Sequence, residues 1–116
     1  MDLRTSDRRA TPRLRVQFRT TFSGSTKLDG TGLLLDLSTF GCRIESPVTV
    51  GLGISLELRI YVPDLEEPLM IEAASVQWVS NQTFGLAFHR TTDTEHQRLG
   101  QVIMDLMEGG EEKAYH

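Results

Sequence analysis

Two short polar stretches contain the residues whose types and spacing fit ligand binding. The first is RRATPR, residues 8–13, which supplies Arg8, Arg9 and Arg13. A guanidinium is a permanently charged planar fork that binds a phosphate, or the O6/N7 edge of guanine, through two hydrogen bonds. Pro12 favours an extended chain, in which Arg9 and Arg13 lie about 13 Å apart. This spacing suits a ligand with two separated phosphates or bases.

The second stretch is DLSTFG, residues 36–41. The Asp36 carboxylate can accept hydrogen bonds from guanine N1–H and N2–H together, and Ser38 lies on the same side of the chain. Gly41 permits a positive φ or the close approach of a ligand to the backbone. A purely structural alternative stays open, in which Asp36 pairs with Arg43 across a hairpin while Ser38 and Gly41 only complete the turn.

The charge distribution favours a local anion site over a broad nucleic-acid-binding surface. The 116-residue chain has a net charge of -4, yet residues 1–20 hold six arginines against two aspartates. The remaining residues carry six basic and fourteen acidic side chains. A protein that binds DNA or RNA over a broad face would show the opposite balance. A solvated basic arm without a ligand is the alternative reading of the arginine cluster.

The hydrophobic pattern predicts an all-β domain that positions these two stretches. Alternation of apolar and polar residues indicates six strands, and their spacing is typical of a closed or nearly closed antiparallel β-barrel. In the second strand we expect Leu33, Leu35 and Leu37 to share one face, with Leu34, Asp36 and Ser38 on the other. The predicted strands cover residues 13–22, 33–38, 42–45, 53–62, 69–80 and 83–90.

A change of period at Thr92 predicts a C-terminal α-helix. Thr92 and Glu95 form a T-x-x-E capping box, and apolar residues then recur at helical spacing over about four turns. We expect the apolar stripe to pack on the barrel, with a partner protein as the competing occupant, and Gly109 with Gly110 to end the helix. The stripe consists of Leu99, Val102, Ile103, Leu106 and Met107. The predicted organisation is a basic arm (1–12), a barrel with its closing helix (13–109) and a flexible tail (110–116).

The two stretches together resemble the signatures of the PilZ domain family. Arg9-ATP-Arg13, with an extra arginine at Arg8, is similar to R-x-x-x-R, and Asp36-L-Ser38-TF-Gly41 is similar to [D/N]-x-S-x-x-G. The resemblance extends over about residues 7–107. It implies a six-stranded antiparallel barrel that binds cyclic di-GMP, two guanines linked by two phosphates.

The resemblance also assigns roles to the motif residues. It implies that the two arginines of R-x-x-x-R hold phosphates and guanine edges, that Asp36 and Ser38 read a guanine, and that Gly41 permits close approach. Arg8 favours a stacked pair of ligands over a single one. Arg43 and Trp78 are further candidate contacts, and core packing is the alternative for Trp78.

These observations together predict a non-enzymatic receptor in which bound cyclic di-GMP orders the N-terminal arm, and the changed surface is read by an unidentified downstream protein. No Ser-His-Asp set, Cys-His set or zinc spacing occurs, and the lone Cys42 reads as a buried apolar residue. We expect no metal, cofactor, DNA, RNA or membrane insertion, and a location in the bacterial cytoplasm. An interaction module that does not need the nucleotide and a barrel that binds single-stranded nucleic acid are the competing hypotheses.

Overall fold

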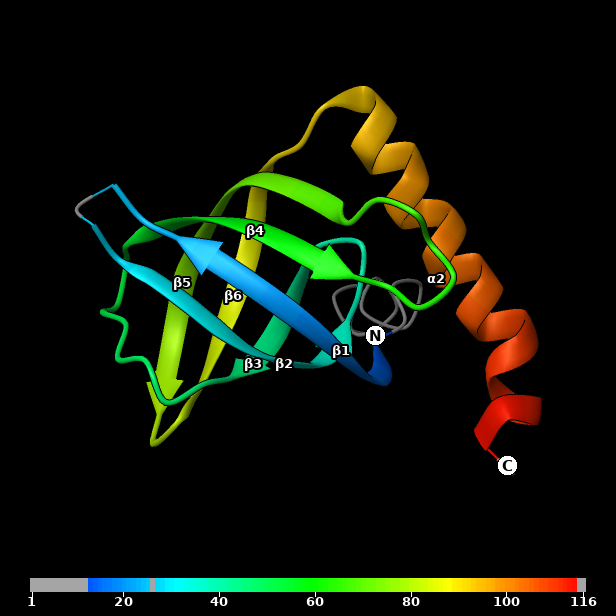
Figure 1. Ribbon diagram of the computed structural model, residues 1–116, viewed down its shortest axis with the longest axis horizontal. Helices are drawn as coiled ribbons and strands as arrows, with labels where there is room; N and C mark the ends of the chain where they lie inside the picture. The colour runs from blue at the N-terminus through cyan, green and yellow to red at the C-terminus, as the bar shows by residue number, and fades with distance from the viewer. Residues whose placement is uncertain (1–12, 26, 115–116) are drawn as a thin grey trace, which may run out of the picture.

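The protein folds as a six-stranded antiparallel β-barrel with a C-terminal helix, as the sequence predicts (Figure 1). The computed structural model describes residues 13–25 and 27–114, with side chains as far as Glu108. The strands are β1 (Leu14–Ser23), β2 (Asp29–Leu37), β3 (Gly41–Glu45), β4 (Ser55–Tyr61), β5 (Leu69–Ser80) and β6 (Thr83–Arg90). The helix is α2 (Asp93–Ala114).

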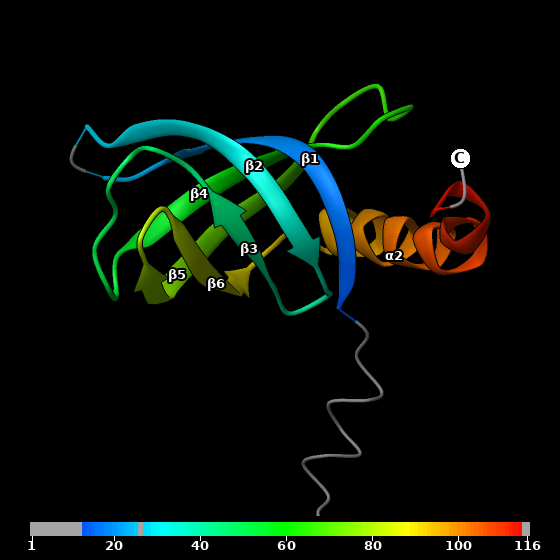
Figure 2. The same ribbon diagram turned by 90° about the horizontal axis from the view of Figure 1, so that it is seen from below.

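The sheet closes on itself in the order β1-β2-β3-β6-β5-β4, with β4 pairing back onto β1. Closure gives every strand a hydrogen-bonded neighbour on both sides. The β2–β3 turn follows Leu37, which pairs with Leu14 at the start of β1. Figure 2 shows the two segments side by side at one end of the barrel. The fold therefore brings the end of the first motif to the second.

The core fills the barrel interior with the inward-facing residues of all six strands. Alternation in the sequence predicts that Phe22, Ile44, Leu58 and Phe84 face inward from β1, β3, β4 and β6, and each is at most 2% exposed. The rings of Phe22 and Phe84 meet edge to face, with centroids 5.5 Å apart. Burial of these side chains, at about 1.5–3 kcal/mol each, is the main driving force for the fold.

The predicted facing of β2 is wrong for its leucines. Leu34 is fully buried, whereas Leu33 and Leu35 are only partly buried. The cause is a β-bulge, because Leu34 pairs with Ile44 and Asp36 pairs with Arg43, so Leu35 and Asp36 together lie opposite one residue of β3. An extra residue shifts the alternation by one position. Both Leu34 and Leu37 thereby reach the core while Asp36 stays on the outer face.

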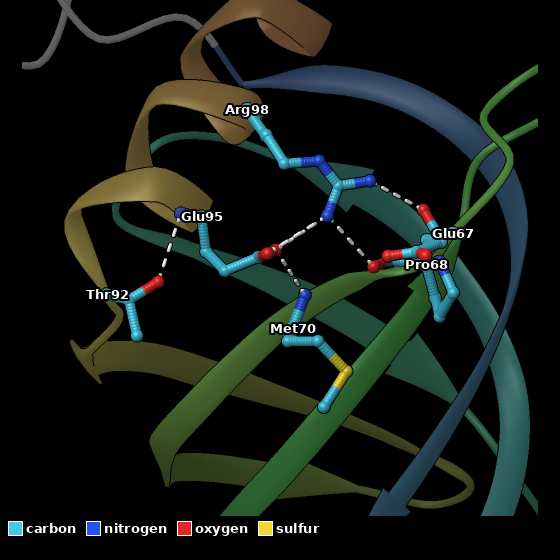
Figure 3. Close-up of polar contacts among 6 residues, drawn as sticks. All are labelled: Glu67, Pro68, Met70, Thr92, Glu95 and Arg98. Atoms are coloured by element: carbon cyan, nitrogen blue, oxygen red, sulfur yellow. Dashed lines mark hydrogen bonds and ion pairs between the residues drawn. The ribbon is translucent and has the colours of Figure 1, made fainter.

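Polar contacts hold the first turns of α2 against the strand β5 and the loop before it (Figure 3). The Thr92 hydroxyl accepts the backbone N–H of Glu95 at 3.1 Å, so the Thr92 half of the predicted capping box is confirmed, whereas the Glu95 carboxylate makes other contacts. The Glu95 carboxylate accepts the Met70 N–H at 2.9 Å and pairs with Arg98. Arg98 also donates to the carbonyls of Glu67 and Pro68. Glu95 therefore fixes α2 to the barrel as well as marking its first turn.

The apolar stripe of α2 packs on the barrel through Leu99, Val102 and Ile103, each at most 6% exposed. Met107, which the sequence places in the same stripe, is 51% exposed. The predicted end of the helix at Gly109 is also wrong, because α2 continues through both glycines to Ala114. A helical glycine costs about 1 kcal/mol relative to alanine, which weakens a helix without ending it.

Candidate functional site

A continuous row of paired residues crosses the outer face of five strands. Arg15 of β1 lies opposite Asp36 of β2, and Asp36 lies opposite Arg43 of β3. Arg43 pairs in turn with Gly85 of β6, and Gly85 pairs with Trp78 of β5. Residues directly opposite each other on antiparallel strands project from the same face of the sheet. Side chains from distant parts of the sequence therefore converge at one place outside the barrel.

Asp36 is the centre of an ion-paired cluster in this row. Its Oδ1 lies 2.7 Å from Arg13 Nη1 and its Oδ2 lies 3.3 Å from Arg43 Nε. The carboxylate is 10% exposed, whereas the side chains of Arg13 and Arg43 are 54% and 40% exposed. The Arg43 Nε atom is buried and, despite its proximity to Asp36, makes no well-aligned hydrogen bond. The cluster carries one net positive charge and presents two guanidiniums to solvent.

Ser38 organises the turn between β2 and β3. Its hydroxyl oxygen accepts the N–H groups of Phe40 and Gly41, both at 3.1 Å, and contacts the Gly41 carbonyl at 3.3 Å. The Ser38 N–H donates to the same carbonyl at 2.9 Å. Serine commonly satisfies turn backbone in this way. The hydroxyl that the sequence assigns to guanine is therefore engaged within the turn.

Gly41 is required by the approach of β3 to β6. A Cβ at this position would lie 2.2 Å from the backbone oxygen of Leu86. The φ of Gly41 is not in the left-handed region, since Gly53 is the glycine with a positive φ among the described residues. Gly41 thus allows the backbones of β3 and β6 to pack closely. The sequence had suggested a positive φ or the close approach of a ligand instead.

Trp78 packs against Gly85 at the far end of the row. A Cβ on Gly85 would lie 2.1 Å from Trp78 Nε1, so the absence of a side chain provides the space for the indole. The side chain of Trp78 is exposed, at 42%, so the alternative of core packing is wrong. A second bulge explains this position, because Val76 pairs with Leu86 and Trp78 pairs with Gly85, leaving Gln77 and Trp78 together on the outer face.

These side chains line an open groove of about 480 Å³ on the outer face. The volume is within the range of small-molecule sites in proteins. Its charged wall is formed by Arg13, Asp36 and Arg43, and its aromatic wall by Trp78 at the other end of the row. This arrangement fits a ligand with both phosphates and bases. The groove is lined by Arg13, Asp36, Phe40, Gly41, Cys42, Arg43, Gln77, Trp78, Gly85, Leu86 and Ala87.

Among the groove residues that the sequence did not single out, Phe40 and Gln77 have exposed side chains that a ligand can reach. Phe40, 66% exposed, precedes Gly41 in the turn, and its carbonyl accepts the Phe88 N–H at 2.8 Å, which anchors its backbone to β6. Gln77 lies beside Trp78 through the bulge on β5. An aromatic residue within a polar turn is a signal that can be read from the sequence, and the stretch DLSTFG contains one, Phe40. Gln77 follows buried Val76 and so faces outward by alternation, and the bulge that turns Trp78 to the same face leaves no signal in the sequence.

The described part of the first motif is Arg13, since Arg8 and Arg9 lie outside the described residues.

Cys42 is confirmed as buried, at 1% exposure. Burial, reinforced by the nearby Asp36 carboxylate, raises the pKa of the Cys42 thiol far above its usual range, against a smaller lowering effect of Arg13. The thiol therefore stays protonated and takes no part in nucleophilic chemistry at the groove.

Residues 13–25 and 27–108, whose side chains the structure describes, contain no group of three histidine, cysteine, aspartate or glutamate side chains placed to hold a metal ion. Within the same ranges, no helix has the length and apolar character that a membrane crossing requires.

Comparison with known proteins identifies a family and a shared fold. A family model described as the PilZ domain matches residues 7–105. A search of curated proteins gave no match to the chain. The family match covers both polar stretches as well as all six strands.

Several solved structures share the fold at low sequence identity. The PilZ domain of YcgR from Escherichia coli with c-di-GMP superposes with a TM-score of 0.75 at 16% identity, over 92% of this chain and 97% of that one. YcgR from Escherichia coli in complex with c-di-GMP gives 0.72 at 17% identity, over 92% and 49%. The inhibitor of motility MotI/DgrA from Bacillus subtilis gives 0.69 at 18% identity, over 85% and 51%. The chain thus spans about half the length of the last two proteins.

Proposed function

The chain belongs to the PilZ domain family, and from this premise we propose that it is a non-enzymatic receptor for cyclic di-GMP. The observation that carries the proposal is the contact between the two motifs: Arg13 of R-x-x-x-R meets Asp36 of D-x-S-x-x-G at 2.7 Å, inside one groove. Two structures with the same fold contain this nucleotide. Cyclic di-GMP has two phosphates and two guanines, which match the charged and aromatic walls of the groove.

The guanidiniums of Arg13 and Arg43 bind phosphate oxygens or guanine edges in this proposal, and the Trp78 indole stacks on a base. Asp36 holds both arginines in place before the ligand enters, and it accepts from guanine only when a ligand oxygen takes over one guanidinium. Ser38 and Gly41 contribute by setting the turn and its approach to β6. Stacking of a base on an aromatic side chain contributes about 1–3 kcal/mol.

Arg8 and Arg9 complete the clamp in this proposal. The N-terminal arm that carries them becomes ordered over the ligand, and the changed surface is read by a downstream protein. The additional arginine at Arg8 favours binding of a stacked pair of ligands, and stoichiometry distinguishes this from a single molecule. In this proposal the receptor acts in the bacterial cytoplasm.

Calorimetric titration of the full chain with cyclic di-GMP at low salt tests the proposal. We expect Arg13→Ala to weaken binding roughly 10- to 100-fold, because charge-assisted hydrogen bonds are worth about 1.5–3 kcal/mol. Arg90→Ala is the matched control, since Arg90 is also an exposed arginine paired with a carboxylate, that of Glu72, but lies outside the groove. Absence of binding by the unchanged chain would refute the proposal.

A second candidate is an interaction module of the same fold that does not need the nucleotide. The observation in its favour is that Asp36, Ser38 and Gly41 all have structural partners without any ligand. A pulldown separates the two functions. A partner retained when Arg9, Arg13 and Asp36 are all replaced by alanine supports the module, and loss of the partner supports the receptor.

A further inference from the structure

Asp36 and Ser38, the two acceptors that the sequence assigns to guanine recognition, already have partners within the protein. The two oxygens of Asp36 face the guanidiniums of Arg13 and Arg43, at 2.7 and 3.3 Å. The Ser38 hydroxyl is engaged with the backbone of its own turn. A guanine that enters the groove without breaking these contacts needs another hydrogen-bonding partner.

Gln77 has the chemistry and the position to be that partner. The bulge on β5 places it beside Trp78 on the outer face, where both line the groove. Among the described residues that line the groove, its side chain alone offers an uncharged donor and an uncharged acceptor together. It can therefore form two hydrogen bonds to the edge of a base that stacks on Trp78.

Two neighbouring side chains fix the orientation of the Gln77 amide. Gln77 Nε2 donates to Ser75 Oγ at 2.7 Å, and Ser75 Oγ lies 2.5 Å from His89 Nε2. When His89 is neutral and protonated on Nδ1, the Ser75 hydroxyl donates to Nε2 and its oxygen accepts from Gln77. This contact places Nε2 of the amide on the Ser75 side. The amide oxygen and the second N–H remain for a ligand.

We propose that Gln77 is a specificity-determining residue of the groove and that Ser75 and His89 are its positioning residues. The inference rests on the proposed binding of cyclic di-GMP. Guanine presents the acceptor O6 beside the donor N1–H, whereas adenine presents the donor N6–H beside the acceptor N1. A base held in one place thus requires opposite orientations of the amide in the two cases. An amide fixed by Ser75 matches only one of them, which in a receptor for cyclic di-GMP is guanine.

The test is a titration of the full chain and its variants with cyclic di-GMP and cyclic di-AMP, which differ only in their bases. We expect Gln77→Ala to weaken cyclic di-GMP binding about tenfold. Ser75→Ala lowers the ratio of the two affinities about three- to tenfold, and Ser75→Thr, which keeps the hydroxyl, retains the ratio. Gln82→Ala and Ser80→Ala are matched controls, because both residues are exposed and neither lines the groove.

The outcomes separate this inference from the proposed function. If the unchanged chain binds cyclic di-GMP while Gln77→Ala and Ser75→Ala leave both affinities unchanged, the inference is overturned and the receptor function stands. Equal loss of both nucleotides in Ser75→Ala also overturns it, since a structural defect lowers both affinities without changing their ratio. If the unchanged chain binds neither nucleotide, both the proposed function and this inference are refuted.

Discussion

Replacement of Gly85 by alanine tests whether Trp78 forms the aromatic wall of the groove. The new Cβ would lie 2.1 Å from Trp78 Nε1 and 2.5 Å from Cε2, where nonbonded carbon contacts are about 3.5–4.0 Å. The indole must therefore move by more than about 1 Å. Because Trp78 is 42% exposed, it can rotate toward solvent without displacing the backbone.

The displacement should affect ligand binding more than folding. A shifted, off-rotamer side chain costs about 0.5–1.5 kcal/mol, which lowers Tm by roughly 2–6 °C for a domain of this size. Loss of stacking on one base costs about 1–3 kcal/mol, so the Kd for cyclic di-GMP should rise roughly 5- to 150-fold.

Intrinsic fluorescence reports this change directly, because Trp78 is the only tryptophan in the sequence. We expect Gly85→Ala to shift the emission maximum and to reduce the response to cyclic di-GMP, with calorimetry giving the affinity. Gly100→Ala is the matched control, since a Cβ there meets no atom within 4 Å. At this helical position alanine should stabilise the fold by about 1 kcal/mol and leave binding unchanged.

Two results would refute this reasoning. If Gly85→Ala binds cyclic di-GMP with unchanged affinity and unchanged emission, the indole does not contribute to the site. If Gly85→Ala instead unfolds the domain, the assumption that Trp78 can rotate away is wrong.

Three further predictions concern stability and reactivity. Gly41→Ala should destabilise the domain by about 2–4 kcal/mol in thermal unfolding, because its Cβ would meet the backbone oxygen of Leu86 at 2.2 Å; a Tm within a few degrees of the parent would contradict this. The Cys42 thiol, whose pKa is raised by burial, should resist iodoacetamide at mildly alkaline pH until guanidinium chloride unfolds the chain; native labelling would disprove it. Glu95→Ala should cost about 1–2 kcal/mol in urea unfolding, since it leaves the Met70 N–H without its acceptor, and Glu95→Gln should recover part of this loss.

Local patterns in the sequence account for much of the fold. Strict alternation in β1 and β4 and the change of period at Thr92 predict the strands, the inward positions and the helix start. These features depend on neighbouring residues, so a sequence pattern contains them. The two motifs likewise indicate the family, because their residue types follow from what a phosphate and a guanine require.

Three features depend on tertiary structure. The bulge at Leu35 and Asp36 depends on pairing with β3, and the bulge at Gln77 and Trp78 depends on pairing with β6. Alternation read from the sequence assumes regular pairing, which is why the facing of β2 was wrong and that of Trp78 was left open. The position of α2 is also settled by a contact distant in sequence, between Glu95 and the start of β5.

The sequence alone identified Arg13, Asp36, Ser38 and Gly41 as candidate ligand contacts, because they stand in two recognisable motifs. Barrel closure decided what those residues touch: Asp36 holds two arginines, and Ser38 and Gly41 shape a turn packed on β6. It also brought Gln77 and Trp78, about forty residues further along the chain, to the same groove. Residue types are local information, whereas contacts between strands exist only once the sheet has closed.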